Sequence, residues 1–214
     1  NSARVPSLAG RIIPEPLFSE QEYEEGILAP IRRDLARLDP EGHLRPEFSN
    51  ARGAIARFDR GSIEIRLIDM QEHPAADLLI ATAAISVLRL LAEERWASLA
   101  ELKRWSIERL QPILEATIRA GGDAVIRDLD YLALFGYPRN LGPATADALW
   151  DHLISPQRGA TALAEHLDMN LEIALHALMS RGCLARRMVD ALGQNGYRAD
   201  LMRLYRDLAT RLER

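Results

Sequence analysis

Glu64 and Arg66 are the residues of this 214-residue chain whose types and spacing could do chemistry together. They lie two residues apart in the stretch 62–67 (SIEIRL), where polar and apolar residues alternate. On an extended strand, this alternation places both charged side chains on one face. A carboxylate suits Mg²⁺, and a guanidinium offers planar donors that suit phosphate oxygens. The spacing indicates a site for a metal-bound phosphate, although such pairs also form plain ion pairs on solvated strand faces.

A second stretch, Ala51–Phe58, could form the partner strand, because Asp59–Gly61 between the two is typical of a hairpin loop. With a three-residue loop, Arg52 shares the polar face with the acid–base pair. A two-residue loop shifts the register by one and brings Arg57 to that face instead. The sequence leaves both registers open.

The rest of the chain is predicted to be almost wholly helical, which gives an α+β fold that is mostly helical. Ser-x-x-Glu capping boxes at Ser19 and Ser98 predict helix starts, and Pro74 suits a first helical turn. The helix from Ser98 is expected to run to Gly121. Further helices are predicted at Ala75–Glu94, Ala144–Leu153, Ala160–Leu167, Leu171–Arg181, Leu184–Leu192 and Ala199–Leu212.

Composition narrows the class of protein. The net charge of −4 and the pI of about 5.8 argue against a nucleic-acid partner, since dedicated binders are more often basic. The longest apolar run, Leu78–Leu88, falls short of the roughly 20 residues that span a bilayer, so no membrane partner is expected. Cys183 is the single cysteine, and we expect it to be a small buried residue. These features suit a cytoplasmic protein.

A longer stretch of sequence resembles a known family. Residues Asn50–Phe58 and Ser62–Gln71 resemble the bacterial glutamate–cysteine ligase family of the second type, which includes general carboxylate–amine ligases. Ile13–Phe18 and Pro74–Leu78 are similar to it as well, so the resemblance covers residues 10–95. The hairpin also resembles the wider glutamine synthetase-like superfamily.

The resemblance implies roles for five residues. Glu64 matches a metal-binding glutamate, and Arg66 matches an arginine that contacts the transferred phosphoryl group and is catalytic. Arg52 and Arg57 match arginines that hold nucleotide phosphate or substrate carboxylate, and Asn50 matches a substrate-side polar residue. The implied reaction uses ATP and Mg²⁺ to convert a carboxylate into an acyl phosphate, which an amine then attacks. The family's usual substrates are glutamate and cysteine, in glutathione biosynthesis.

The resemblance also implies a fold and partners. Residues 1–95 would be the C-terminal part of a glutamine synthetase-like catalytic domain, whose hairpin packs with a helical region at residues 96–214. Family members are about twice this length, so we expect the missing N-terminal half or a partner chain to supply other metal-binding acids. Assembly into a homo-oligomer is expected too.

A second hypothesis concerns residues 159–187, which are predicted to form two short helices joined by a tight turn. This pattern resembles a helix–turn–helix, and Arg186 and Arg187 add positive charge. The alternative function is therefore a helical interaction or regulatory module, possibly one that binds DNA. Local acidic residues cancel much of that charge, and an ordinary helical hairpin is the favoured interpretation of the pattern.

Overall fold

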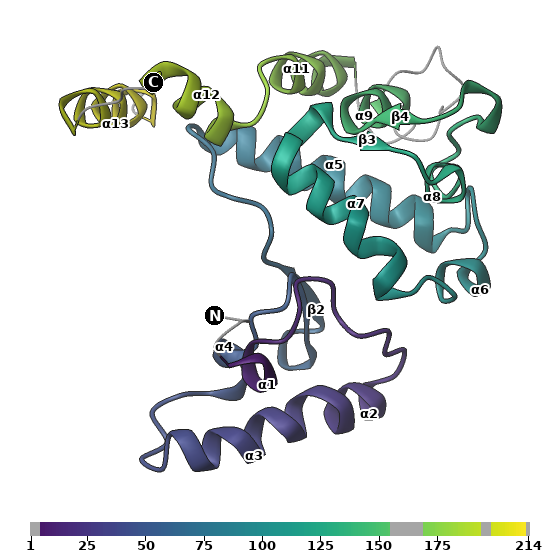
Figure 1. Cartoon of the computed structure of the whole chain (residues 1–214), viewed down its shortest axis with the longest axis vertical. Coiled ribbons are helices and arrows are strands. Elements are labelled where there is room, and N and C mark those ends of the chain that lie inside the picture. Colours follow the sequence, from purple (N-terminus) through teal and green to yellow (C-terminus); the bar gives the residue numbers. More distant parts are fainter. Residues whose placement is uncertain (1–4, 155–168, 194–197, 213–214) are drawn as a thin grey trace. The chain divides into compact units, whose positions relative to one another are not determined.

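The computed structural model describes residues 5–154, 169–193 and 198–212 (Figure 1). It divides into two compact units, which are described one at a time. The first unit comprises the chain up to Asp69 together with Trp105–Gln111, and the second comprises Met70–Arg104 and the chain from Pro112 onward. The division at residue 95 follows from the resemblance and stays a prediction.

The first unit contains a helical rod, which is the continuous helical stretch at residues 20–38, and a β-hairpin at residues 54–65. Its elements are α1 (Pro6–Ala9), α2 (Glu20–Tyr23), the π-helical turn η1 (Glu24–Leu28), α3 (Ala29–Leu38), α4 (Pro46–Ser49), β1 (Ala54–Arg57), the 3₁₀ turn η2 (Phe58–Arg60) and β2 (Ser62–Ile65). The side chain of Ser19 accepts from the backbone N–H of Glu22, as the capping box predicts. Pro30 lies in the first turn of α3, where its missing N–H disturbs the helix least.

One face of the rod forms the core of this unit. Tyr23, Ile27, Ile31 and Leu35 follow each other at intervals of four residues, so they lie on one side of the helices. All four are buried, together with Leu8. The same spacing therefore gives the rod an apolar side on which the hairpin packs.

The hairpin has the register that brings Arg57, and not Arg52, to the face of Glu64. The opposed pairs are Ala54–Ile65, Ile55–Glu64, Ala56–Ile63 and Arg57–Ser62. The register follows from the turn: η2 is closed by Gly61, whose φ of 58° is a left-handed conformation that glycine adopts at no steric cost. The loop is neither of the two expected lengths, because four residues, 58–61, join the strands, but the register is the one expected from a two-residue loop.

The apolar residues of β2 are exposed. Alternation along residues 62–67 predicts a half-buried strand, but Ile63 is 71% exposed, Ile65 41% and Leu67 55%. Burial is concentrated on the other strand, where Ile55 is 2% exposed. The helical rod covers β1, and nothing among the described residues covers this row of β2.

The second unit is helical with two very short strands. Its elements are α5 (Pro74–Ala92), α6 (Leu99–Leu102), α7 (Ile107–Ala120, which begins in the first unit), η3 (Gly121–Asp123), β3 (Val125–Ile126), α8 (Leu129–Ala133), η4 (Arg139–Leu141), β4 (Ala144–Thr145), α9 (Ala146–Ile154), α11 (Met169–Ser180), α12 (Leu184–Leu192) and α13 (Arg198–Leu212). The antiparallel strands β3 and β4 were not predicted.

The helix predicted from Ser98 to Gly121 is two helices. Ser98 and Glu101 form both halves of the capping box, so α6 begins as expected. It ends at Leu102, and the side chain of Ser106 accepts from the backbone N–H of Arg109 as α7 begins. A second capping serine thus starts a new helix where one long helix was expected.

Helix α5 is the central helix of the second unit. Its inner side contributes Leu79, Ala83, Val87 and Leu90 to a core that also includes residues of β3, α8, β4, α9 and α11. With 19 residues, α5 is long and apolar enough to cross a membrane by length and composition, contrary to the sequence expectation. In the structure, 28% of its apolar window is buried, on the side that packs in this core.

The C-terminal helices bear on the helix–turn–helix hypothesis. Its first predicted helix, Ala160–Leu167, lies outside the described residues, whereas α11 and α12 are present. Cys183 is exposed just before α12, contrary to the expectation that it is buried. The charges of both arginines are engaged within the chain: Arg187 forms a bidentate pair with Glu72 at 2.7 and 2.9 Å, and Arg186 donates to the carbonyl of Ala120 at 3.1 Å.

Candidate functional site

Glu64 lies between two arginines on one face of the hairpin. Its Oε1 accepts from Nε of Arg66 at 2.8 Å, and its Oε2 accepts from Nη1 of Arg57 at 3.0 Å. The hydrogen bond from Arg66, and then that from Arg57, hold the pKa of the Glu64 carboxyl below its ordinary value. Glu64 is therefore a carboxylate at neutral pH, which is the form that a metal ion binds.

Arg57 joins the strand to the turn. Its side chain is buried, and its Nε and Nη2 donate to the two oxygens of Asp59 at 3.2 and 3.1 Å. The hydrogen bonds that Arg57 donates to Asp59 and Glu64 raise its pKa, and the same hydrogen bonds to Asp59 lower the pKa of that carboxyl. Arg57 thus positions Glu64, and its partner Asp59 was not singled out in the sequence although it lies only two residues away.

Arg66 is anchored by backbone as well as by Glu64. Its Nη1 donates to the carbonyl of Asn50, and its Nη2 donates to that of Glu47 at 3.3 Å. The guanidinium is half-buried, with 24% of the side chain exposed. These contacts fix its plane beside the carboxylate, and the exposed part of the group can meet an anion.

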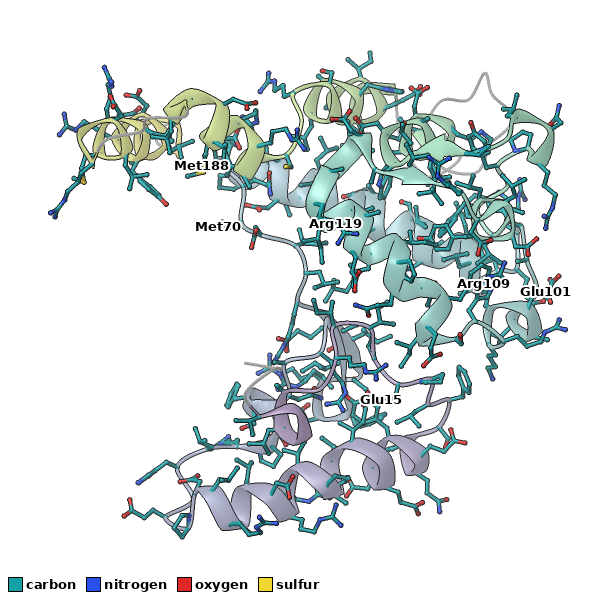
Figure 2. The ribbon with its side chains drawn as sticks, viewed as in Figure 1. Glu15, Met70, Glu101, Arg109, Arg119 and Met188 are labelled. Carbon is teal, nitrogen blue, oxygen red and sulfur yellow. The ribbon has the colours of Figure 1, made fainter. Side chains whose placement is uncertain are left out.

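Arg52 belongs to a second, separate cluster. It forms a bidentate pair with Glu15 at 2.5 and 2.6 Å, and its Nη1 donates to Oδ1 of Asn50 at 3.1 Å. Burial raises the pKa of Glu15, but the hydrogen bonds and charge of Arg52 outweigh that effect and leave it lowered. Figure 2 shows Glu15 beside the strands of the first unit. Arg52 is thus held in a structural ion pair and is only 5% exposed, much as Arg57 is held by its own two carboxylate partners.

Asn50 connects the two clusters. Its side chain binds Arg52, and its Nδ2 also donates to the hydroxyl of Tyr23 at 3.1 Å. That hydroxyl accepts in addition from the backbone N–H of Ala56 in β1. Asn50 is 1% exposed, so it ties the helical rod, the strand and Arg66 together from a buried position.

A cavity of about 330 Å³ opens beside these residues. Its lining combines aromatic rings with guanidinium groups and includes Asn50 and Arg57 from the predicted site, whereas Glu64, Arg66 and Arg52 do not line it. The lining residues are Tyr23, Leu28, Arg45, Glu47, Phe48, Asn50, Ile55, Ala56, Arg57, Phe58, Asp59 and Arg60. Flat apolar rings and cationic groups are what a nucleotide requires, since its base stacks and its phosphates are anionic. Sequence reasoning missed Arg45, Phe48 and Arg60, which carry no periodic or motif signal.

The described residues do not form a complete magnesium site here. Among the described residues, no three His, Cys, Asp or Glu side chains gather closely enough to hold a metal ion. Glu64 is the predicted metal ligand, and its chemistry fits because hard oxygen ligands suit Mg²⁺. Its other ligands would have to be phosphate oxygens, water or acids from further polypeptide, as Mg²⁺ commonly uses in phosphoryl-transfer sites.

Comparisons with known proteins leave the family open. No family model matches the chain, and no solved structure matches it. An uncharacterized protein of Archaeoglobus fulgidus is 30% identical over 135 residues, which cover 62% of this chain and 33% of that protein. The chain therefore spans about a third of the length of the curated relative that it matches.

Proposed function

We propose that this chain is part of an ATP-dependent carboxylate–amine ligase similar to glutamate–cysteine ligase. The observation that supports it most is that Glu64 is held ionised between Arg57 and Arg66, and that Arg57 also lines a cavity with further arginines and aromatic rings. A fixed carboxylate and fixed guanidinium groups are what phosphoryl transfer needs from a protein, because catalysis there is mostly positioning and charge neutralisation.

The proposed reaction has two balanced steps. A carboxylate oxygen of the first substrate attacks the γ-phosphorus of ATP, and ADP leaves. The amine nitrogen of the second substrate then attacks the acyl carbon, phosphate leaves with the carboxylate oxygen, and the nitrogen loses a proton. Mg²⁺ supplies charge neutralisation on the phosphate oxygens.

Each predicted residue takes a role that its contacts allow. Arg66 is the catalytic residue, whose exposed donors face the phosphoryl group being transferred, and Glu64 is the metal ligand. Arg57 positions Glu64 and borders the cavity, so it holds nucleotide phosphate from the side. Asn50 and Arg52 lie behind these groups, and Arg52 reaches a substrate only if it exchanges its Glu15 partner.

Other parts of the enzyme are proposed to lie outside this chain. Glu64 alone does not complete a magnesium site, so an N-terminal half or a partner chain would add the remaining acids. Glutamate and cysteine are the proposed substrates, in glutathione biosynthesis in the cytoplasm. The hairpin would then belong to a glutamine synthetase-like sheet.

Calorimetric titration with ATP and Mg²⁺ tests the proposal. We expect Arg66→Ala to weaken ATP binding roughly tenfold or more, since one charge-assisted hydrogen bond contributes about 1.5–3 kcal/mol. Glu64→Gln should weaken binding only when Mg²⁺ is present. Arg89→Ala, which removes an exposed arginine of α5, is the control and should bind as the wild type does. Absence of binding by the wild type, or equal binding by Arg66→Ala, would contradict the proposed role of the hairpin.

A further inference from the structure

Two aromatic side chains are exposed on the lining of the cavity in the first unit. Phe48 is 67% exposed and Phe58 is 43% exposed. Exposed aromatic rings forgo the free energy that burial would give them, so rings gathered at a cavity mark a place where a ligand can cover them. The volume of about 330 Å³ lies near the lower end of the ~300–1,000 Å³ that is usual for small-ligand sites. The cavity therefore has the size and the apolar surface to hold a small molecule.

The ring of Phe58 is supported from behind. It lies nearly perpendicular to the ring of Tyr23, with the centroids 5.5 Å apart and the planes at 80°. The hydroxyl of Tyr23 is held in turn by the side chain of Asn50 at 3.1 Å and by the backbone N–H of Ala56 at 3.3 Å. One wall of the cavity is thus fixed before any ligand arrives, which lowers the entropic cost of packing a ring there.

The arginines of the lining differ in how many of their donors are free. Arg57 donates from all three guanidinium nitrogens to Asp59 and Glu64. The Arg45 side chain, by contrast, has no hydrogen-bond or ion-pair partner among the residues that the structure describes. Arg60 lies 3.7 Å from Asp59, and its side chain is 67% exposed. A negatively charged group in the cavity would therefore be bound by Arg45 and Arg60.

The charge of the lining favours an anion. Its three arginines outnumber its two acids, Glu47 and Asp59. Asp59 is already held by two hydrogen bonds from Arg57, and a free guanidinium binds carboxylate or phosphate oxygens through parallel N–H donors. Arg45 and Phe48 lie in one short segment, in which the backbone N–H of Phe48 donates to the carbonyl of Arg45 at 3.1 Å. That segment brings an aromatic ring and a free guanidinium to the same cavity.

We propose that this cavity binds a flat ring that carries a negatively charged group, with the ring against Phe48 and Phe58 and the charge on Arg45 and Arg60. Aromatic packing and guanidinium pairing together recognise such a molecule. Nucleoside monophosphates and aromatic carboxylates are the two sources of this chemistry. The site goes beyond the proposed function, because it needs no Mg²⁺ and the proposed metal and phosphoryl ligands of the hairpin do not line the cavity.

Calorimetric titration without Mg²⁺ tests the class of ligand. AMP and indole-3-carboxylate are the two ring-bearing anions, and each is compared with its uncharged counterpart, adenosine or indole-3-carboxamide, and with inorganic phosphate. We expect at least one anion to bind about tenfold or more tightly than its uncharged counterpart and than phosphate, because these engage only part of the site. Tighter binding of AMP assigns the site to a nucleotide, and tighter binding of the carboxylate assigns it to an aromatic acid. Absence of binding by both anions up to about 10 mM, or equal binding of the uncharged rings, would overturn the proposal.

Two variants test the residues. Phe48→Ala and Arg45→Gln should each weaken binding of the preferred anion about tenfold, by removing ring packing in one case and charge pairing in the other. Both side chains are exposed, so the fold should persist, which circular dichroism checks. Leu38→Ala and Arg37→Gln are the matched controls, since they change an exposed apolar residue and an exposed arginine of α3 that do not line the cavity. Wild-type affinity in either Phe48→Ala or Arg45→Gln would overturn the proposal.

This test and the titration with ATP and Mg²⁺ can fail separately. Binding of AMP or the carboxylate without any binding of ATP and Mg²⁺ would contradict the proposed function and keep this site. Binding of ATP and Mg²⁺ that depends on the hairpin, without binding of either ring-bearing anion, would overturn this site alone.

Discussion

At the scale of single residues, Glu64 is kept ionised by two guanidinium groups that hold both of its oxygens. Its pKa is lowered in the folded chain, first by Arg66 and then by Arg57. A carboxyl whose pKa is lower in the folded state stabilises the fold above its unfolded pKa of about 4.3. That contribution is lost as the pH falls through the lower, folded value.

The first prediction follows from the lowered pKa of Glu64 in the folded chain. We expect the free energy of unfolding of the wild type to fall as the pH is lowered from about 5 toward 2, and to fall less steeply in Glu64→Gln, which has no carboxyl to protonate. Denaturant titrations at a series of pH values, with probes in the hairpin, measure both slopes. Glu93→Gln changes an exposed carboxyl of the second unit and should keep the wild-type slope; a wild-type slope in Glu64→Gln would contradict the ion-pair network.

Residue types and local spacing predicted Glu64, Arg57 and Arg66, because all three lie within one hairpin. Glu15 was beyond such reasoning, since it pairs with Arg52 across 37 positions of sequence. The cavity was missed for the same reason: its aromatic and basic residues come from α2, α4 and the turn, and only the folded chain brings them together. Local alternation identifies a charged face, whereas long-range partners decide which arginines remain accessible.

At the scale of elements, the hairpin depends on a close approach at Gly53. A Cβ at this position would lie 2.7 Å from the carbonyl oxygen of Ile12 and 2.9 Å from the side chain of Leu67. The backbone N–H of Gly53 also donates to that carbonyl at 2.7 Å, so the segment cannot move away without losing a hydrogen bond. The glycine therefore sets how closely residues 10–13 lie against the hairpin.

The second prediction is that Gly53→Ala destabilises the chain by about 1–3 kcal/mol, the usual cost of overpacking a tight contact. Thermal and denaturant unfolding measure the change. Ala51→Ser adds one atom at an exposed neighbouring position and should change stability by less than about 0.5 kcal/mol. A wild-type stability in Gly53→Ala would show that the close approach is absent in solution.

Capping residues made helix starts predictable, and loop geometry made the register unpredictable. Ser19 and Ser98 cap helices as expected, because their side chains accept backbone N–H groups, and Pro74 begins α5 because the first turn does not use its missing N–H. The register depends on a 3₁₀ turn closed by Gly61, and the sequence allowed two loop lengths there. β3 and β4 have two residues each, which is too short for a periodic pattern to show.

At the scale of the whole molecule, the proposal concerns a chain that matches only part of a longer relative. It spans about a third of the length of its archaeal relative, and its described residues do not gather three metal-binding side chains. The proposed function therefore assigns this chain ATP contacts without the full set of metal ligands. On this proposal, the chain can bind a nucleotide without being able to turn it over.

The third prediction is that the chain alone binds ATP without turnover. ADP formation with Mg²⁺, glutamate and cysteine should stay at the buffer background, because a magnesium ion bound by one protein carboxylate is not held in place for transfer. A coupled assay of ADP measures it, and Glu64→Gln is the control. Turnover that Glu64→Gln abolishes would show that the site is complete within this chain.

The central claim is that ATP and its metal bind at Glu64, and paramagnetic broadening by Mn²⁺ tests it most directly. Mn²⁺ prefers the same oxygen ligands as Mg²⁺ and broadens the amide resonances of nearby residues in NMR spectra. With ATP present, we predict that the strongest broadening falls on residues 63–66 and that Glu64→Gln removes it. Broadening centred elsewhere in the chain, or unchanged in Glu64→Gln, would contradict the account.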